Sequence, residues 1–247
     1  MLVAGAWAVH LYTASGAMFG LFAIDRAVHG DFRGSFLAMA AATAIDSTDG
    51  TLARAVHIHD RVPQIDGALL DNIVDYLTFV VAPVYLIVRA EIIPAGAPGT
   101  ALAALVLLMS ALGFCHTEAK TEDHYFRGFP SYWNLVALYL YCFGLSPWTN
   151  FAIIAALALM VLVPIKCIYP SRTVPMRSLT LTLGAIWAVA TVAMLPQLPR
   201  PSPFLLAISF AYVLYYFGVS FILQARNALN EPASPLARRI AARWRRA

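Results

Sequence analysis

Long apolar stretches recur along the whole chain and constrain its fold more than any other feature. Eight of them approach the roughly 17–25 mostly apolar residues that a helix needs to cross a bilayer. They lie near residues 5–25, 35–57, 68–89, 99–116, 131–147, 149–168, 178–195 and 203–223. Only 12% of the 247 residues are charged, about half the share of roughly 25% in soluble domains. The sequence therefore predicts an all-α polytopic membrane protein, a bundle of about eight transmembrane helices. The stretches lack the strict alternation of a membrane β-barrel.

The distribution of basic residues predicts how the bundle is oriented. With eight spans and both termini on one side, 13 of the 17 lysines and arginines fall on that side. Because basic loops remain in the cytoplasm, we expect a cytoplasmic N-terminus. We expect a transmembrane domain over residues 1–225 and a basic cytoplasmic tail over 226–247. The tail is typical of a segment resting on anionic headgroups, and a frayed soluble tail fits it equally well.

Four aspartates interrupt two neighbouring apolar stretches. They are Asp46, Asp49, Asp71 and Asp75. Residues three or four apart share a helix face, so each pair forms a stripe, and two antiparallel helices joined by a short turn can bring the stripes together. Carboxylates inside membrane helices are costly and need a cationic partner. Grouped carboxylate oxygens suit Mg²⁺, Mn²⁺ or Ca²⁺. No cysteine lies on either stripe and His57 lies a turn beyond, which argues against zinc.

Small residues and one arginine share these stripes: Gly50, Ala53, Arg54 and Gly67. A flat ligand can approach the backbone at a glycine, and Arg54 can make paired hydrogen bonds to a phosphate. Taken singly, each glycine is better explained by close helix packing, and Arg54 by a side chain that reaches the interface. Together they predict phosphate chemistry at the cytoplasmic end of the second and third spans. Asp60 is predicted to be solvated, and Asp66 to cap the third helix.

The order and spacing of these residues resemble a known family. D-x-x-D-G-x-x-A-R followed by G-x-x-x-D-x-x-x-D is similar to the signature of the CDP-alcohol phosphotransferases, and all eight fixed positions are present. Twelve residues, 55–66, separate Arg54 from Gly67, a longer spacing than is usual in the family. That spacing resembles the bacterial phosphatidylcholine synthase branch. So do the segments DGALLDNIVDYLTFVVAP, AKTEDHYFRGFPSYWN and IYPSR.

The resemblance implies a reaction and roles for the stripe residues. Such an enzyme joins choline to CDP-diacylglycerol and releases CMP. Asp46, Asp49 and Asp71 match positions that bind divalent metal, and Asp75 matches one that contributes to the metal site and acts as general base. The nucleotide site is matched by Gly50, Ala53, Arg54 and Gly67. The resemblance further implies one or two Mn²⁺ or Mg²⁺ ions, a homodimer in a bacterial inner membrane, an active site facing the cytoplasm, and no nucleic-acid partner.

A quaternary ammonium such as choline binds against aromatic faces, and the longest polar loop has several nearby. The predicted choline-binding residues are Tyr76, Glu118, Tyr125, Tyr132 and Trp133. Any one of these rings, alone, is more often a membrane-interface anchor. Lys120 and Arg172 are predicted to hold the lipid diphosphate, although most basic residues on that side only set topology. From the first span, His10 and Thr13 can reach the nucleotide, but hydrogen bonding to a neighbouring helix explains them better.

Three alternatives remain open at this point. The same chemistry could use serine, inositol or glycerol phosphate as acceptor, because the motif identifies the donor better than the acceptor. The acidic, aromatic segment 116–134 favours choline. A cation transporter could use the four aspartates as its ion site, although the internal repeats of many transporters are missing here. A purely structural membrane protein has no use for the carboxylates.

Overall fold

The computed structural model describes residues 2–116, 125–168 and 176–230, and its helices follow the predicted apolar stretches. The helices are α1 (Leu2–Val28), α2 (Phe32–Ala55), α3 (Ile58–Arg61), α4 (Gly67–Asp75), the π-helix η1 (Tyr76–Val81), α5 (Ala82–Arg89), α6 (Ala97–Phe114), α7 (Trp133–Phe143), α8 (Pro147–Met160), α9 (Arg177–Met194), the 3-10 helix η2 (Leu195–Gln197) and α10 (Pro203–Asn230). The predicted basic tail lies outside the described residues from 231 onwards.

Several of these helices can cross a membrane. Within the described residues, five segments are long and apolar enough: Val3–Val28, Gly67–Arg89, Ala97–Phe114, Arg177–Gln197 and Pro203–Gln224. The helices α7 and α8 are apolar but shorter, and α2 carries the aspartates of the first stripe. The chain is therefore an all-α, multi-pass membrane protein, as predicted. The number of eight crossings remains a prediction.

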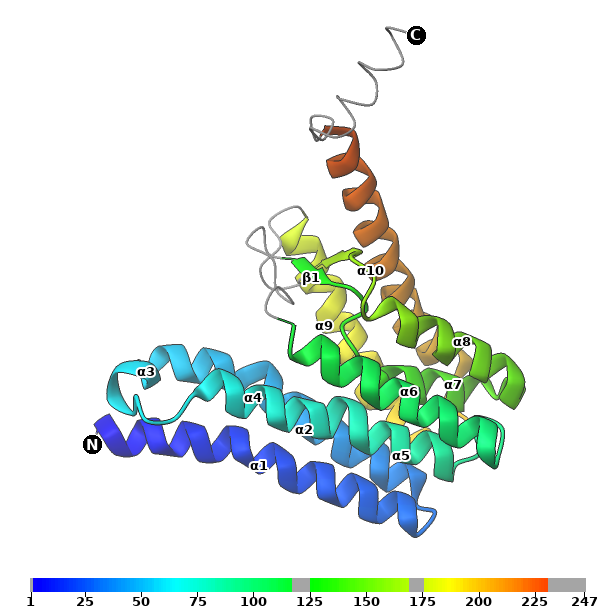
Figure 1. Cartoon of the computed structure of the whole chain (residues 1–247), viewed down its shortest axis with the longest axis horizontal. Coiled ribbons are helices and arrows are strands. Elements are labelled where there is room, and N and C mark those ends of the chain that lie inside the picture. The colour runs from blue at the N-terminus through cyan, green and yellow to red at the C-terminus, as the bar shows by residue number, and fades with distance from the viewer. Residues whose placement is uncertain (1, 117–124, 169–175, 231–247) are drawn as a thin grey trace, which may run out of the picture.

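The first helices form the part of the bundle that matters most for function. Figure 1 shows α1, α2 and α4 running alongside one another, with α3 near the N-terminus. The helix α1 packs against α2, α4 and α5. Further along, α6 packs on α5 and α8, and α9 pairs with α10. The main core lies between α5, α6, α7 and α8, where Leu86, Val106, Trp133 and Ile154 are almost completely buried.

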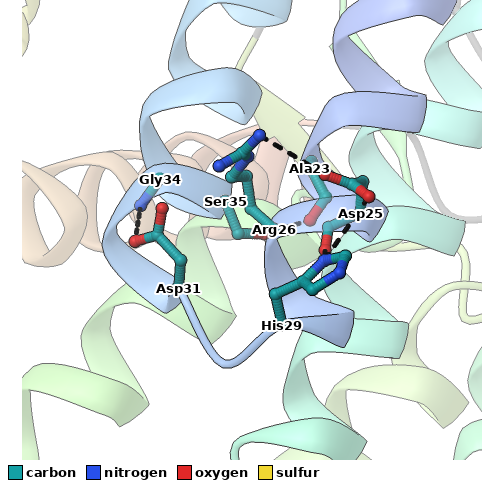
Figure 2. Close-up of polar contacts among 7 residues, drawn as sticks. All are labelled: Ala23, Asp25, Arg26, His29, Asp31, Gly34 and Ser35. Carbon is teal, nitrogen blue, oxygen red and sulfur yellow. Dashed lines mark hydrogen bonds and ion pairs between the residues drawn. The ribbon is translucent and has the colours of Figure 1, made fainter.

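The turn between α1 and α2 is fixed by polar contacts, which Figure 2 shows. Asp31 caps α2 by accepting a hydrogen bond from the Gly34 amide at 2.9 Å, as a short polar side chain does at a helix N-terminus. The buried Ser35 hydroxyl donates to the Ala23 carbonyl oxygen at 2.7 Å. These contacts hold α2 against α1 and so fix which side chains of the two helices lie opposite each other.

The glycines of α1 let α4 and the π-helix approach closely. A Cβ at Gly16 would lie 2.7 Å from Val74 Cγ1, and one at Gly20 would lie 2.9 Å from Leu77 Cγ. Small residues four apart are the usual means by which membrane helices come into backbone contact. The pair was not predicted from the sequence, although Gly16 and Gly20 are four residues apart in the chain.

Two short strands correct the predicted spans. The strand β1 (Tyr125–Arg127) pairs antiparallel with β2 (Lys166–Ile168), so the stretch predicted as a helix over 149–168 ends as α8 at Met160. Pro164 cannot donate a backbone hydrogen bond to a continuing helix. The Phe129 amide instead donates to the Met160 carbonyl oxygen at 3.0 Å, satisfying an acceptor at the end of α8. The strands depend on this long-range contact, which no local pattern indicates.

The close approach of α1 predicts an asymmetric response to two alanine substitutions. Gly16→Ala should lower the free energy of unfolding by about 1–3 kcal/mol, because Val74 must shift to make room. Gly5→Ala serves as the matched control, since no atom of the described residues lies within 4 Å of its Cβ position. It should be neutral or stabilise α1. Unfolding in detergent measures both. Equal midpoints for Gly16→Ala and Gly5→Ala would contradict the packing described here.

Candidate functional site

Three of the four predicted aspartates meet between α2 and α4. One carboxylate oxygen from each of Asp46, Asp49 and Asp71 lies within 4.8 Å of the other two. Asp49 is buried, and the other two are half-buried. Asp46 and Asp49 share a face of α2 because they are three residues apart, and Asp71 approaches from α4. Three carboxylates this close together disfavour full ionisation unless a cation compensates them.

The donor set fits a hard divalent cation. The group contains only carboxylates, and oxygen ligands suit Mg²⁺ and Mn²⁺, whereas zinc prefers histidine and cysteine. Three carboxylates supply fewer ligands than an octahedral Mg²⁺ takes, which leaves positions for oxygens of a substrate. Asp46, Asp49 and Asp71 are thus the residues that would hold a metal ion.

A residue of α1 orients the buried carboxylate. The Thr13 hydroxyl donates a hydrogen bond to Asp49 Oδ2 at 2.8 Å, and this contact is buried. One residue away, Tyr12 Oη and Thr48 Oγ1 lie 2.9 Å apart. Hydrogen bonds of this kind fix the orientation of metal-binding carboxylates. The expectation that Thr13 bonds to a neighbouring helix is confirmed, and its partner is one of the predicted ligands.

Asp75 lies at a change in helix type. It is the last residue of α4 and directly precedes the π-helix η1. The helix widens because Pro83, near the start of α5, has no amide to donate and its ring crowds the carbonyl four residues earlier. Single π-turns within α-helices often occur at functional sites. Asp75 does not belong to the group of three carboxylates, so its predicted role as a metal ligand remains a prediction.

The remaining stripe residues lie within about one helical turn of the carboxylates along their own helices. A Cβ at Gly50 would meet only Arg54 Nη1, at 3.5 Å, and one at Gly67 would meet only His10. The exposed Arg54 guanidinium donates to Thr51 Oγ1 at 3.0 Å and, in the described part of the chain, forms no ion pair. Ala53 is half-buried between them. The side chains next to the carboxylates are therefore small, and the positively charged Arg54 guanidinium beside them can bind an anionic ligand.

The connection between the two stripes is also ordered by its own residues. Asp66 caps α4 by accepting hydrogen bonds from the amides of Ala68 and Leu69, both at 3.0 Å. The predicted N-cap is confirmed. The side chain of Asp60, on α3, is 78% exposed, as predicted for a solvated carboxylate.

The aromatic residues predicted to bind choline are spread over different environments. Trp133 is completely buried, and its indole N–H donates to Ser110 Oγ at 2.8 Å. This environment is that of a core side chain and gives no support to a choline contact. Tyr125, on β1, is also buried. Tyr76 is half-buried and donates to the Leu107 carbonyl oxygen at 3.0 Å, and the half-buried Tyr132 ring lies 6.2 Å from that of Phe79.

Three predicted binding residues cannot be placed. Glu118, Lys120 and Arg172 lie outside the described residues. Their predicted contacts with choline and the diphosphate therefore remain predictions.

Comparison with known proteins identifies the family. Residues 8–225 match the CDP-alcohol phosphatidyltransferase family. The chain is 36% identical to the phosphatidylcholine synthase of Legionella pneumophila over 87% of each chain. It is also 36% identical to that of Pseudomonas aeruginosa, over 91% of this chain and 94% of the relative. The phosphatidylcholine synthase of Legionella bozemanae is 39% identical over 83% of this chain and 97% of the relative.

These matches extend over nearly the whole chain, including the helices that carry the three carboxylates. The protein belongs to the CDP-alcohol phosphatidyltransferase family and is an enzyme of this class.

The cluster of three carboxylates predicts that an Asp-to-Asn substitution affects metal binding at Asp49 but not at Asp60. Asp49→Asn should weaken Mn²⁺ binding by more than about tenfold, because it removes a charged ligand from the group, whereas Asp60→Asn should leave binding unchanged. Thr13→Val should weaken binding about 10–100-fold through the lost orientation of Asp49. Mn²⁺ titration followed by electron paramagnetic resonance measures all three. Wild-type affinity in Asp49→Asn would rule out a metal ion at this position.

Proposed function

We propose that the protein is a phosphatidylcholine synthase, which transfers the phosphatidyl group of CDP-diacylglycerol to choline and releases CMP. The observation that carries this proposal is the convergence of Asp46, Asp49 and Asp71 beside a small, basic surface. Choline is proposed as the acceptor because each relative named above is a phosphatidylcholine synthase that aligns over most of this chain.

CDP-diacylglycerol is proposed to bind with its diphosphate next to the carboxylates of Asp46, Asp49 and Asp71. Asp46, Asp49 and Asp71 would hold one or two Mn²⁺ or Mg²⁺ ions, which would supply positive charge to neutralise the diphosphate and the leaving CMP. Arg54 is exposed next to Gly50 and can make paired hydrogen bonds to a phosphate. Gly50, Ala53 and Gly67 are proposed to line the nucleotide site. Gly50 and Ala53 present little side chain there, and the Cβ position of Gly67 lies 3.4 Å from His10 Cε1. Lys120 and Arg172 are further candidates for the diphosphate on sequence grounds.

Asp75 is proposed to take the proton of the choline hydroxyl. It lies one helical turn beyond Asp71, on the same face of α4, and so near the reacting phosphorus. The choline oxygen forms a bond to the lipid-side phosphorus, the bond from that phosphorus to the bridging oxygen breaks, and CMP leaves with the electron pair. Asp75 must be within hydrogen-bond reach of the hydroxyl for this step.

Choline is proposed to bind next to Asp75, close to residues that follow Asp75 along the chain. Tyr76 is the adjacent residue, and the ring of Tyr132 lies close to Phe79, one turn further along the same segment. Aromatic faces attract quaternary ammonium ions. Tyr125 and Glu118 are proposed as more distant contributors, and the buried Trp133 as a support for its neighbour Tyr132.

We also propose that the enzyme resides in a bacterial inner membrane with its site open to the cytoplasm. The charge distribution supports this orientation, and α3, next to the site, lies at the same end of the bundle as the N-terminus (Figure 1). A homodimer is proposed on the family resemblance alone.

An acceptor panel tests the reaction. Purified protein in detergent should release CMP from CDP-diacylglycerol only when choline and Mn²⁺ or Mg²⁺ are both present. Serine, inositol and glycerol phosphate should give no release above background. Release with one of these acceptors instead of choline would keep the donor chemistry but refute the acceptor. Cation uptake without any CMP release would favour a transporter.

A second substitution tests the proposed base. Asp75→Asn should reduce kcat about 10²–10⁴-fold, the usual contribution of a general base, while CMP and Mn²⁺ still bind. Asp25→Asn, at the far end of α1 and 44% exposed, provides the matched control and should retain full activity. If Asp75→Asn instead loses Mn²⁺, the residue is a metal ligand; unchanged kcat would remove it from the mechanism altogether.

A further inference from the structure

A histidine of α1 is buried next to the site, and one of its two ring nitrogens is unpaired among the described residues. His10 is only 5% exposed, yet its Nε2 has no hydrogen-bond partner among the described residues. An unpaired buried polar atom costs about as much as a lost hydrogen bond, so native proteins rarely keep one without a reason. The ring centroid of Trp7 lies 6.2 Å from that of His10. Packing alone would be served better by leucine at this position.

The imidazole faces the backbone of the predicted nucleotide site. A Cβ at Gly67 would lie 3.4 Å from His10 Cε1 and 4.0 Å from Nδ1. Along α1, His10 is three residues before Thr13, which bonds to Asp49. On α4, Gly67 is four residues before Asp71, which is also about one helical turn. Both His10 and Gly67 therefore lie about one helical turn, roughly 5 Å, from the carboxylates in the direction of α3.

This position suits the nucleoside of the donor better than its diphosphate. The carboxylates and Arg54 already provide for the phosphates, and the Asp66 carboxylate, which caps α4 next to Gly67, repels a second anion. Lipid chains extend into the bilayer, so the water-soluble part of the donor extends the opposite way, toward α3. An imidazole can donate or accept one hydrogen bond at each nitrogen, which matches the polar edge of a pyrimidine or a ribose hydroxyl.

We infer that His10 is a donor-binding residue that hydrogen-bonds the nucleoside part of a cytidine nucleotide lying against Gly67. The inference rests on the proposed function and adds α1 to the helices that recognise the substrate. In this arrangement Thr13 and His10, one turn apart, serve the metal end and the nucleoside end of the same ligand.

The test compares ligands that contain the nucleoside with one that lacks it. His10→Leu should raise the KM for CDP-diacylglycerol and the inhibition constant of CMP about five- to tenfold, the effect of one lost hydrogen bond. The KM for choline and inhibition by inorganic pyrophosphate should not change. His10→Gln, which keeps an amide near the position of Nε2, should recover part of the loss. Ser15→Ala, on the same helix, serves as control because the Ser15 hydroxyl donates only to its own helix, at the Tyr12 carbonyl oxygen. Ribose 5-phosphate as a further inhibitor assigns the contact: weakened inhibition indicates the sugar, and unchanged inhibition indicates the base.

Thermal unfolding separates this role from a structural one. Without nucleotide, His10→Leu should unfold at the wild-type temperature or above it, because an unpaired polar group has been removed, while the rise in unfolding temperature that CMP produces should shrink. A lower unfolding temperature without nucleotide, together with weaker pyrophosphate inhibition, would show that His10 only supports the helix and would overturn the inference. Unchanged CMP inhibition would overturn it as well.

The two proposals can fail independently. CMP binding is measured by the unfolding shift without any turnover, so it tests His10 even if choline proves not to be the acceptor.

Discussion

A carboxyl group buried between membrane helices is the constraint on which the structure depends. Asp49 is only 6% exposed and bonds to Thr13 across the interface of α1 and α2. In a medium with little water, such a group needs a hydrogen bond and a cation. The hydrogen bond fixes how α1 lies on α2. Asp46 and Asp71 bring two further carboxylates within 4.8 Å of Asp49, and the three together could hold a metal ion. The glycines of α1 then allow α4 to come close enough to complete the group.

Much of this arrangement could be predicted because its causes are local. A membrane helix satisfies its own backbone hydrogen bonds, so apolar stretches mark where the helices lie, although several helix ends differ from the prediction by a few residues and α8 ends at Met160. The spacing of Asp46 and Asp49 specifies a shared face on one helix, and that of Asp71 and Asp75 on the next. Asp66 has the side chain and position of an N-cap. Each of these inferences needs only residues within one or two turns.

The features that could not be predicted depend on contacts between distant segments. The strands at Tyr125 and Lys166 form because two loops meet beyond the end of α8, and either loop alone is compatible with coil or helix. Trp133 is the kind of aromatic residue that can bind a ligand, but its indole N–H donates a hydrogen bond to Ser110 on another helix. The unpaired nitrogen of His10 is likewise visible only once α4 lies beside α1.

The turn shown in Figure 2 has a mechanical consequence for the whole enzyme. Ser35 ties α2 to α1 near the turn, and Thr13 ties them again near the other end. A slip of one helix along the other would break both bonds in surroundings that offer no water as a replacement. A bilayer that is too thick or too thin therefore tilts α1 and α2 as a single rod, and the spacing of Asp46 and Asp49 relative to Thr13 stays constant across membranes of different lipid composition.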